Sequence, residues 1–198
     1  MVSPNMVAKR FIVVCLAALL VGFIPNTSAD DNIQSAQTLY PNTQTSEKVC
    51  YTDGCNPVDE VDWWKVEGYM GDVITISFQG KPLNNQDWVC FWGDGWEGDV
   101  SFHRPDGSEI SSTYVTDDDP DVSFTASLSS QSQIFIKIKS RDSNCNDEIR
   151  YDLLATIDTA QRDTDEDGYV DSEDACDFTY GTSVYDRKGC IDSDSDGY

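Results

Sequence analysis

The chain has 198 residues, of which 36 are acidic and 13 are basic, so its formal net charge at neutral pH is −23. This excess of negative charge disfavours binding to nucleic acid or to anionic membrane surfaces, and it favours binding of divalent cations. Most of these carboxylates are expected to contribute only to solubility.

The N-terminus has the order of a secretory signal peptide. Lys9 and Arg10 precede the uncharged apolar run Phe11–Ile24, and the small residues Thr27-Ser-Ala29 follow it. The run has about 14 residues, whereas a bilayer-spanning helix needs about 20, so a retained membrane anchor is disfavoured. We therefore expect export, cleavage after Ala29 and no membrane span in the mature chain. The mature chain keeps all 36 acidic and 11 of the 13 basic residues, a formal charge of −25.

Six of the seven cysteines remain after cleavage, because Cys15 lies in the signal peptide. An even number of cysteines in an exported chain indicates disulfides, and six cysteines allow 15 pairings that the sequence does not decide. Proximity favours Cys50–Cys55 and Cys176–Cys190, which leaves Cys90–Cys145. A zinc site is the alternative, but the spacings do not fit one, and the sole histidine, His103, has no cysteine nearby.

The mature chain shows the periodicity of strands rather than of helices. Residues 30–60 are polar and predict one early strand near Gln37–Tyr40 and otherwise loop. From Asp62 to Ile157, apolar and polar residues alternate in short segments, and turn-forming residues separate these segments. No helical stripe of convincing length is found. The sequence therefore predicts an all-β sandwich.

Several short motifs in this part resemble the bacterial pre-peptidase C-terminal domain. They are the segments at 61–68 and 71–78, the strand and Pro-Asp-Gly turn at 98–108, and the segments at 134–138 and 151–154. The resemblance covers about residues 36–158 and implies a jelly-roll-like β-sandwich that serves as an accessory module in exported proteins, often beside peptidases. It implies no catalysis by the domain itself. Cys90, Cys145 and the aromatic insert around Trp88–Trp96 depart from the family pattern.

Three weaker candidates lie in the same region. The aromatic residues of Trp88–Trp96 could stack on sugar rings, although packing at the sandwich edge around Cys90 is the more ordinary role. The acidic turn Asp117–Asp121 could hold a second calcium ion or be a solvated turn. His103 is expected at the surface, and the common hydrolase motifs are absent, so we expect no catalytic site.

The most specific motif is the run of aspartates between residues 163 and 174. Calcium takes six to eight oxygen ligands, and alternate carboxylates converge on one ion only where the chain turns tightly, as Gly168 allows at position 6 of the loop. Magnesium fits less well because it requires a stricter octahedron. The predicted ligands are Asp163, Asp165 and Asp167 at positions 1, 3 and 5, the carbonyl of Tyr169, Asp171 directly or through water, and Asp174 at position 12.

Residues 163–176 match the thrombospondin type 3 repeat pattern, Asp-x-Asp-x-Asp-Gly-x-x-Asp-x-x-Asp-x-Cys, at every fixed position. An EF-hand or a dockerin would need helices beside the loop, and the flanking sequence predicts none. A second copy starts at Gly189-Cys190 and contributes Asp192, Asp194 and Asp196 as further predicted ligands. The resemblance covers roughly residues 161–198. It implies an irregular extracellular segment that is held by calcium and disulfides and acts as a spacer or adhesion module.

Together these observations predict a signal peptide at 1–29, a β-sandwich at 30–158 and calcium repeats at 159–198, the second of which we expect to continue beyond Tyr198. The predicted function is that of a secreted or cell-surface calcium-binding module for binding, adhesion or spacing, and not that of an enzyme. An extracellular glycan or protein partner is left open. The alternative is the accessory N-terminal part of a larger exported peptidase or glycosidase whose catalytic domain lies outside this chain.

Overall fold

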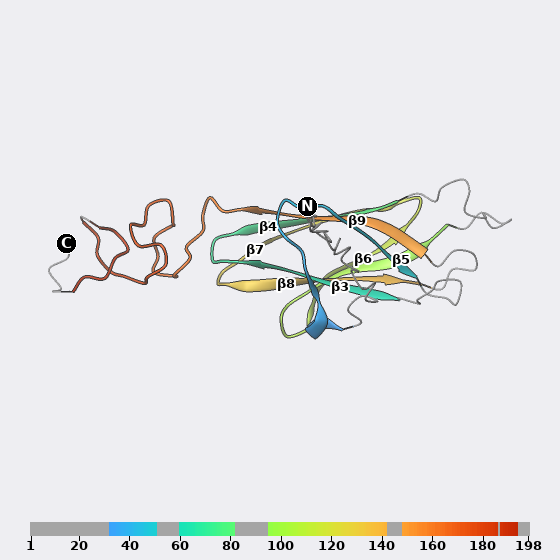
Figure 1. Cartoon of the computed structure of the whole chain (residues 1–198), viewed down its shortest axis with the longest axis horizontal. Coiled ribbons are helices and arrows are strands. Elements are labelled where there is room, and N and C mark those ends of the chain that lie inside the picture. The colour runs from blue at the N-terminus through green and yellow to red at the C-terminus, as the bar shows by residue number, and fades with distance from the viewer. Residues whose placement is uncertain (1–31, 51–59, 82–94, 142–147, 186, 194–198) are drawn as a thin grey trace, which may run out of the picture.

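The computed structural model describes residues 32–50, 60–81, 95–141, 148–185 and 187–193. Two β-sheets face each other, and the chain then leaves them at one end (Figure 1). The first described element is a single 3₁₀ turn, Ile33–Ser35. Within the described ranges no helix has the length and apolar character needed to cross a bilayer. The strands are β1 (Gln37–Thr38), β2 (Thr45–Cys50), β3 (Val61–Gly68), β4 (Val73–Gly80), β5 (Glu97–His103), β6 (Glu109–Thr116), β7 (Asp121–Ser127), β8 (Ser132–Ser140) and β9 (Glu148–Asp158).

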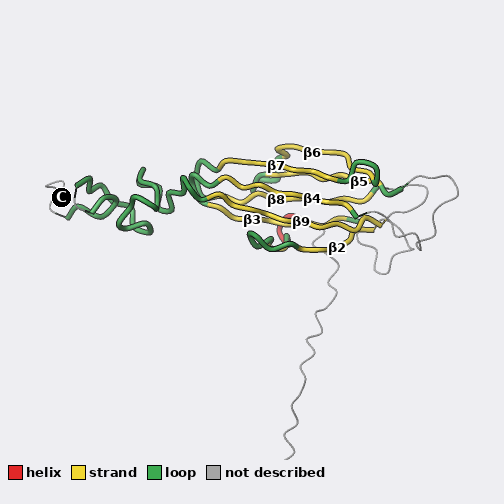
Figure 2. The backbone as a smooth tube through the Cα atoms, turned by 90° about the horizontal axis from the view of Figure 1, so that it is seen from above, coloured by secondary structure: helices red, strands yellow, loops and turns green. Residues whose placement is uncertain are grey.

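The strands form two layers. One sheet has five strands in the order β1-β3-β8-β5-β6, and the other has four in the order β2-β9-β4-β7. Paired strands run antiparallel, except that β1 pairs in parallel with β3. Seen from above, the strands of both layers run lengthwise along the molecule (Figure 2). The predicted all-β sandwich is therefore confirmed.

Alternating burial along the strands builds the core between the layers. Ile74 and Ile76 of β4 and Ile136 and Ile138 of β8 are completely buried, while the residues between them face outward or are half-buried. Full burial of such a side chain is worth roughly 1.5–3 kcal/mol. The two layers also meet through aromatic contact: the rings of Phe102 in β5 and Phe124 in β7 stack with their centroids 4.2 Å apart.

One buried polar network joins the two sheets. The hydroxyl of Tyr151 in β9 donates to the carboxylate of Asp62 in β3, and the indole of Trp64 donates to the same hydroxyl at 2.9 Å. Burial and the neighbouring Asp62 carboxylate raise the pKa of Tyr151 well above its usual range. The phenol therefore stays protonated and able to donate, which keeps this network intact across the interior.

Two strands were not predicted from the sequence. Residues 45–50 were expected to be loop, but they form β2, and residues 109–116 form β6. Both strands lie at the edge of a sheet, and β6 is exposed along most of its length. Because only Val49 and Cys50 in β2 are buried, the alternation that identifies a half-buried strand is missing from its sequence.

An ion pair fastens the turn between β3 and β4 to the segment after β9. The carboxylate of Asp72 is fully buried and receives two hydrogen bonds from the guanidinium of Arg162, each 2.9 Å long, and a third from the Tyr69 amide. Gly71 has a φ of +82°, and a Cβ there would stand 1.6 Å from the carbonyl oxygen of Gln161, so only glycine fits. We call Asp72 and Arg162 the junction pair.

Candidate metal centre

The predicted calcium loop begins immediately beyond the junction pair. The amide of Asp163 donates to the Met70 carbonyl at 2.9 Å, which forms an isolated bridge to the β3–β4 turn. The amide of Gln131, in the β7–β8 turn, donates to Glu166 at 3.0 Å. Two turns at the end of the sandwich therefore hold the start of the loop, and the rest of the segment continues away from the strands (Figure 1).

The structure brings three predicted ligands together. Asp163, Asp165 and Asp167 each offer a carboxylate oxygen, and these atoms all lie within 4.8 Å of one another. The tight turn depends on Gly168, which has a φ of +98° and whose amide donates to Asp163 at 2.9 Å. Asp163 is only 3% exposed, so this group of like charges lies partly out of solvent.

Three carboxylate oxygens in this loop are buried without a hydrogen-bond partner within the described residues. They are Oδ1 of Asp163, Oδ2 of Asp165 and Oδ2 of Asp174, at positions 1, 3 and 12 of the predicted loop. Burial, together with the charges of Asp167, Asp174 and Asp163, raises the pKa of Asp165 above its usual value. Buried anionic oxygens without donors are strongly unfavourable, and a hard cation would satisfy them.

The remaining carboxylates of the loop are held by backbone and hydroxyl donors. Asp167 accepts hydrogen bonds from the amides of Tyr169, at 2.9 Å, and Gly181, at 3.2 Å. Both oxygens of Asp171 accept from Thr164, through its amide and its hydroxyl, each at 2.8 Å. With both oxygens so held, Asp171 would reach a cation more readily through water than directly. The carbonyl of Tyr169 stays a predicted ligand.

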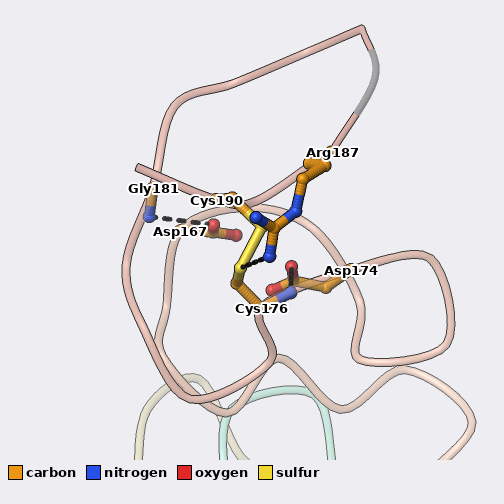
Figure 3. The surroundings of a disulfide bond; sticks show 6 residues. All are labelled: Asp167, Asp174, Cys176, Gly181, Arg187 and Cys190. Carbon is orange, nitrogen blue, oxygen red and sulfur yellow. Dashed lines mark hydrogen bonds between the residues drawn. A yellow bond between two sulfur atoms is a disulfide. The ribbon is translucent and has the colours of Figure 1, made fainter. Parts of the chain in front are cut away.

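A disulfide closes the segment that follows the loop, near Asp167 and Asp174 (Figure 3). Cys176 and Cys190 are joined with their Cα atoms 5.1 Å apart, which confirms the pairing predicted from proximity. Asp174 accepts from the Cys176 amide at 2.6 Å, and a Cβ on Gly189 would stand 2.0 Å from the same carboxylate. The disulfide-closed segment therefore packs directly against Asp174, the ligand predicted at position 12.

The sequence interpretation missed the supporting residues Thr164, Gly181 and Gly189. Each acts through a short side chain or through the backbone, so the aspartate pattern does not reveal it. The two glycines lie close to the cysteine pair, and that spacing is the only sequence feature that marks them. The amide of Gly181 holds the Asp167 carboxylate, and the missing side chain of Gly189 leaves room for that of Asp174.

Replacing Cys176 and Cys190 together by serine is expected to weaken calcium binding about tenfold, because the support of Asp167 and Asp174 would loosen. In a chain-entropy model, a disulfide that closes a loop of this size stabilises the folded segment by about 3 kcal/mol, because it lowers the entropy of the unfolded chain. Calorimetric titration with calcium measures the loss. Urea unfolding followed by tryptophan fluorescence is the control for the stability of the sandwich, because all five tryptophans precede the loop. Unchanged calcium affinity would contradict a supporting role for this segment.

Other predicted features are placed as follows. Asp192 lies at the end of the described chain, and Asp194 and Asp196 lie outside the described residues, as do Cys55, Cys90 and Cys145. Cys50 is disulfide-bonded.

In the aromatic insert only Trp96 of the four aromatics is described, and it is fully buried, as expected for packing at the sandwich edge. The aspartates of 117–119 are exposed. His103 was expected at the surface, but it is only 8% exposed.

Comparison with solved structures gives distant similarities over about three fifths of this chain. The pre-peptidase C-terminal domain of a collagenase from Bacillus anthracis is 13% identical over 64% of this chain and 100% of that one, with a TM-score of 0.41. PliG, a periplasmic inhibitor of g-type lysozyme from Aeromonas hydrophila, is 9% identical over 62% and 97%, with a TM-score of 0.38. CorA, a surface-associated copper-binding protein of Methylomicrobium album BG8, is 9% identical over 63% and 98%, with a TM-score of 0.41. No protein family and no curated protein matches the sequence.

Proposed function

We propose that this chain is an exported calcium-binding module in which residues 163–174 bind one calcium ion and a β-sandwich carries the loop. The module serves binding, adhesion or spacing outside the cell, and the proposal assigns no catalytic step to it. The observation that carries it is the set of three buried carboxylate oxygens, on Asp163, Asp165 and Asp174, that have no donor among the described residues.

The donor set favours calcium over other metals. All the side-chain ligands offered are carboxylate oxygens, which suit calcium, magnesium and manganese rather than copper or zinc. Calcium accepts irregular geometry and six to eight ligands, whereas magnesium requires a near-ideal octahedron and retains its waters. A loop that presents five aspartates and a backbone carbonyl is therefore better suited to the larger ion.

An extracellular location is supported by two independent features. The N-terminal sequence has the charge, apolar run and small residues of an export signal. The Cys176–Cys190 disulfide would persist in an oxidising compartment and would be reduced in most cytoplasms. Extracellular fluids also supply calcium at concentrations that fill sites with dissociation constants of about 10⁻⁴–10⁻³ M.

The test is hydrogen exchange of the full mature chain, measured by mass spectrometry in calcium and in chelator. Calcium should slow exchange at least about tenfold at the amides of Gly168, Tyr169 and Gly181, which donate to the loop carboxylates. Exchange in the strands of the sandwich should change little. Magnesium at the same concentration should protect these amides less.

Equal exchange of the loop amides with and without calcium would overturn the proposal. Equal protection by magnesium would overturn the choice of metal, although not the presence of a cation site. Calorimetric titration of the same material gives the affinity of the site.

A further inference from the structure

The outer face of the five-stranded sheet carries a pocket of about 180 Å³ that the calcium proposal does not use. Strand register aligns its floor: Lys137 of β8 lies opposite Ser101 of β5, which lies opposite Ser112 of β6, and Lys139 lies opposite Asp99 in the next row. About six water molecules occupy this volume in liquid water, so the pocket has room for one ring-sized polar group. Its lining is Asp99, Ser101, Glu109, Ser112, Lys137 and Lys139.

The β8 side of the pocket presents two ammonium groups. Neither Lys137 nor Lys139 is ion-paired within the described part of the chain, and Lys137 lies over the Trp63 ring, 5.4 Å from its centroid. The nearby carboxylate of Asp99 is instead held by Arg141 through two hydrogen bonds of 2.6 Å. Two unneutralised lysines are therefore available to a ligand, in a chain whose net charge is −23.

The β5 and β6 side presents oxygen atoms whose own protons are already committed. Nδ1 of His103 lies 3.2 Å from the carbonyl oxygen of Gly107, which can only accept, so in the neutral ring Nδ1 carries the proton. Nε2 then accepts from the hydroxyl of Ser101 at 2.8 Å. The hydroxyl of Ser112 similarly donates to Glu109 at 2.7 Å. With this tautomer both serine oxygens offer lone pairs, rather than protons, to a ligand.

We propose that this pocket binds one unit of an anionic polysaccharide. The carboxylate or sulfate of the sugar contacts Lys137 and Lys139, and its ring hydroxyls donate to the oxygens of Ser101 and Ser112. A bare sulfate ion has no donors for these serine oxygens, so it would use only the lysine side of the pocket. At physiological ionic strength charges beyond about 8 Å are largely screened, so the groups lining the pocket dominate over the negative charge of the whole chain.

The experiment is calorimetric titration of the full mature chain with short oligosaccharides in the presence of EDTA, which excludes calcium bridging. The probes are a carboxylated oligomer (oligogalacturonate), a sulfated one (heparin-derived) and a neutral one (dextran-derived). The two anionic arms distinguish the source of the negative group. One of them should bind with a stoichiometry of one, and the neutral oligomer should bind at least about tenfold more weakly.

Two variants separate this site from general charge effects. The double variant Lys137→Gln and Lys139→Gln should weaken binding at least about tenfold. The control double variant Lys48→Gln with Lys81→Gln changes one residue of β2 and one just after β4, both strands of the other sheet, and should have little effect at the same change in net charge. Ser112→Ala should weaken binding about fivefold through one lost acceptor.

Several results would overturn the proposal. They are equal binding of the neutral oligomer, an equal loss in the Lys48 and Lys81 control, or no binding by either anionic oligomer. Competition by inorganic sulfate or by free glycine as strong as that of the sugar, with no effect of Ser112→Ala, would show a simple anion or zwitterion site instead. Because EDTA is present throughout, failure here leaves the calcium proposal untouched.

Discussion

Asp165→Asn is expected to lower the calcium affinity of the loop about a hundredfold or more, since it removes one charged ligand while keeping the size of the side chain. The same change should stabilise the loop in chelator, because burial and the charges of Asp167, Asp174 and Asp163 destabilise the charged form of Asp165, as its raised pKa indicates. Opposite effects with and without calcium mark a metal ligand, whereas a purely structural aspartate would lose stability in both conditions. Calorimetry and hydrogen exchange of the Gly168 amide measure the two effects.

Glu173→Gln is the matched control for this variant. It removes the same charge from the same loop, but Glu173 is 63% exposed and pairs only at 3.5 Å with Lys188. The calcium affinity of the Glu173→Gln variant should stay within about threefold of that of the unchanged chain, because exposed ion pairs contribute little. A similar loss of affinity in both variants would indicate that the loop attracts calcium through general charge rather than through defined ligands.

Arg162→Met is expected to destabilise the sandwich by about 3–5 kcal/mol, the second large effect. Asp72 is fully buried, so loss of the guanidinium would leave its carboxylate out of water with a single amide donor, that of Tyr69. The contact of Arg162 with the Tyr69 ring, 4.9 Å from guanidinium carbon to centroid, would also be lost. Urea unfolding followed by tryptophan fluorescence measures the change.

The double variant Asp72→Asn with Arg162→Met should recover part of that loss, because no buried charge remains. Comparable stability of the single and double variants would contradict the importance of the buried charge.

Calcium affinity should fall with Arg162→Met as well, because the adjacent Asp163 amide is hydrogen-bonded to Met70 of the same turn. The junction pair would then be shown to connect the two parts of the chain.

The sequence predicts those strands in which the alternation of apolar and polar residues follows from burial of one face. The alternation at 74–78 and 134–138 identifies β4 and β8, because one face of each strand is buried. It fails for β6, where an edge position leaves most side chains exposed and the pairing with β5 defines the strand. Propensity within a segment cannot report a pairing that is made by another segment.

The same division applies to the candidate metal site. The grouping of Asp163, Asp165 and Asp167 follows from local spacing, because the loop that gathers them is continuous in the chain. The amide of Gly181 and the contact of Gly189 come from a segment that folds back through the disulfide, and Asp72 comes from a turn 90 residues before Arg162. Such long-range contacts depend on tertiary structure and leave no periodic pattern in the sequence.

The position of β9 determines how the molecule would respond to tension. This strand lies inside its sheet, paired with β2 through Glu148–Leu153 and with β4 through Tyr151–Asp158, and the irregular segment leaves its C-terminal end along the direction of the strands (Figure 1). A pull on that segment would meet the junction pair first. It would then load the hydrogen bonds on both sides of β9 in shear, because these bonds lie across the strand and must fail together rather than one at a time. Pairing on both sides of β9 would therefore make the sandwich a mechanical anchor for the segment that follows this strand.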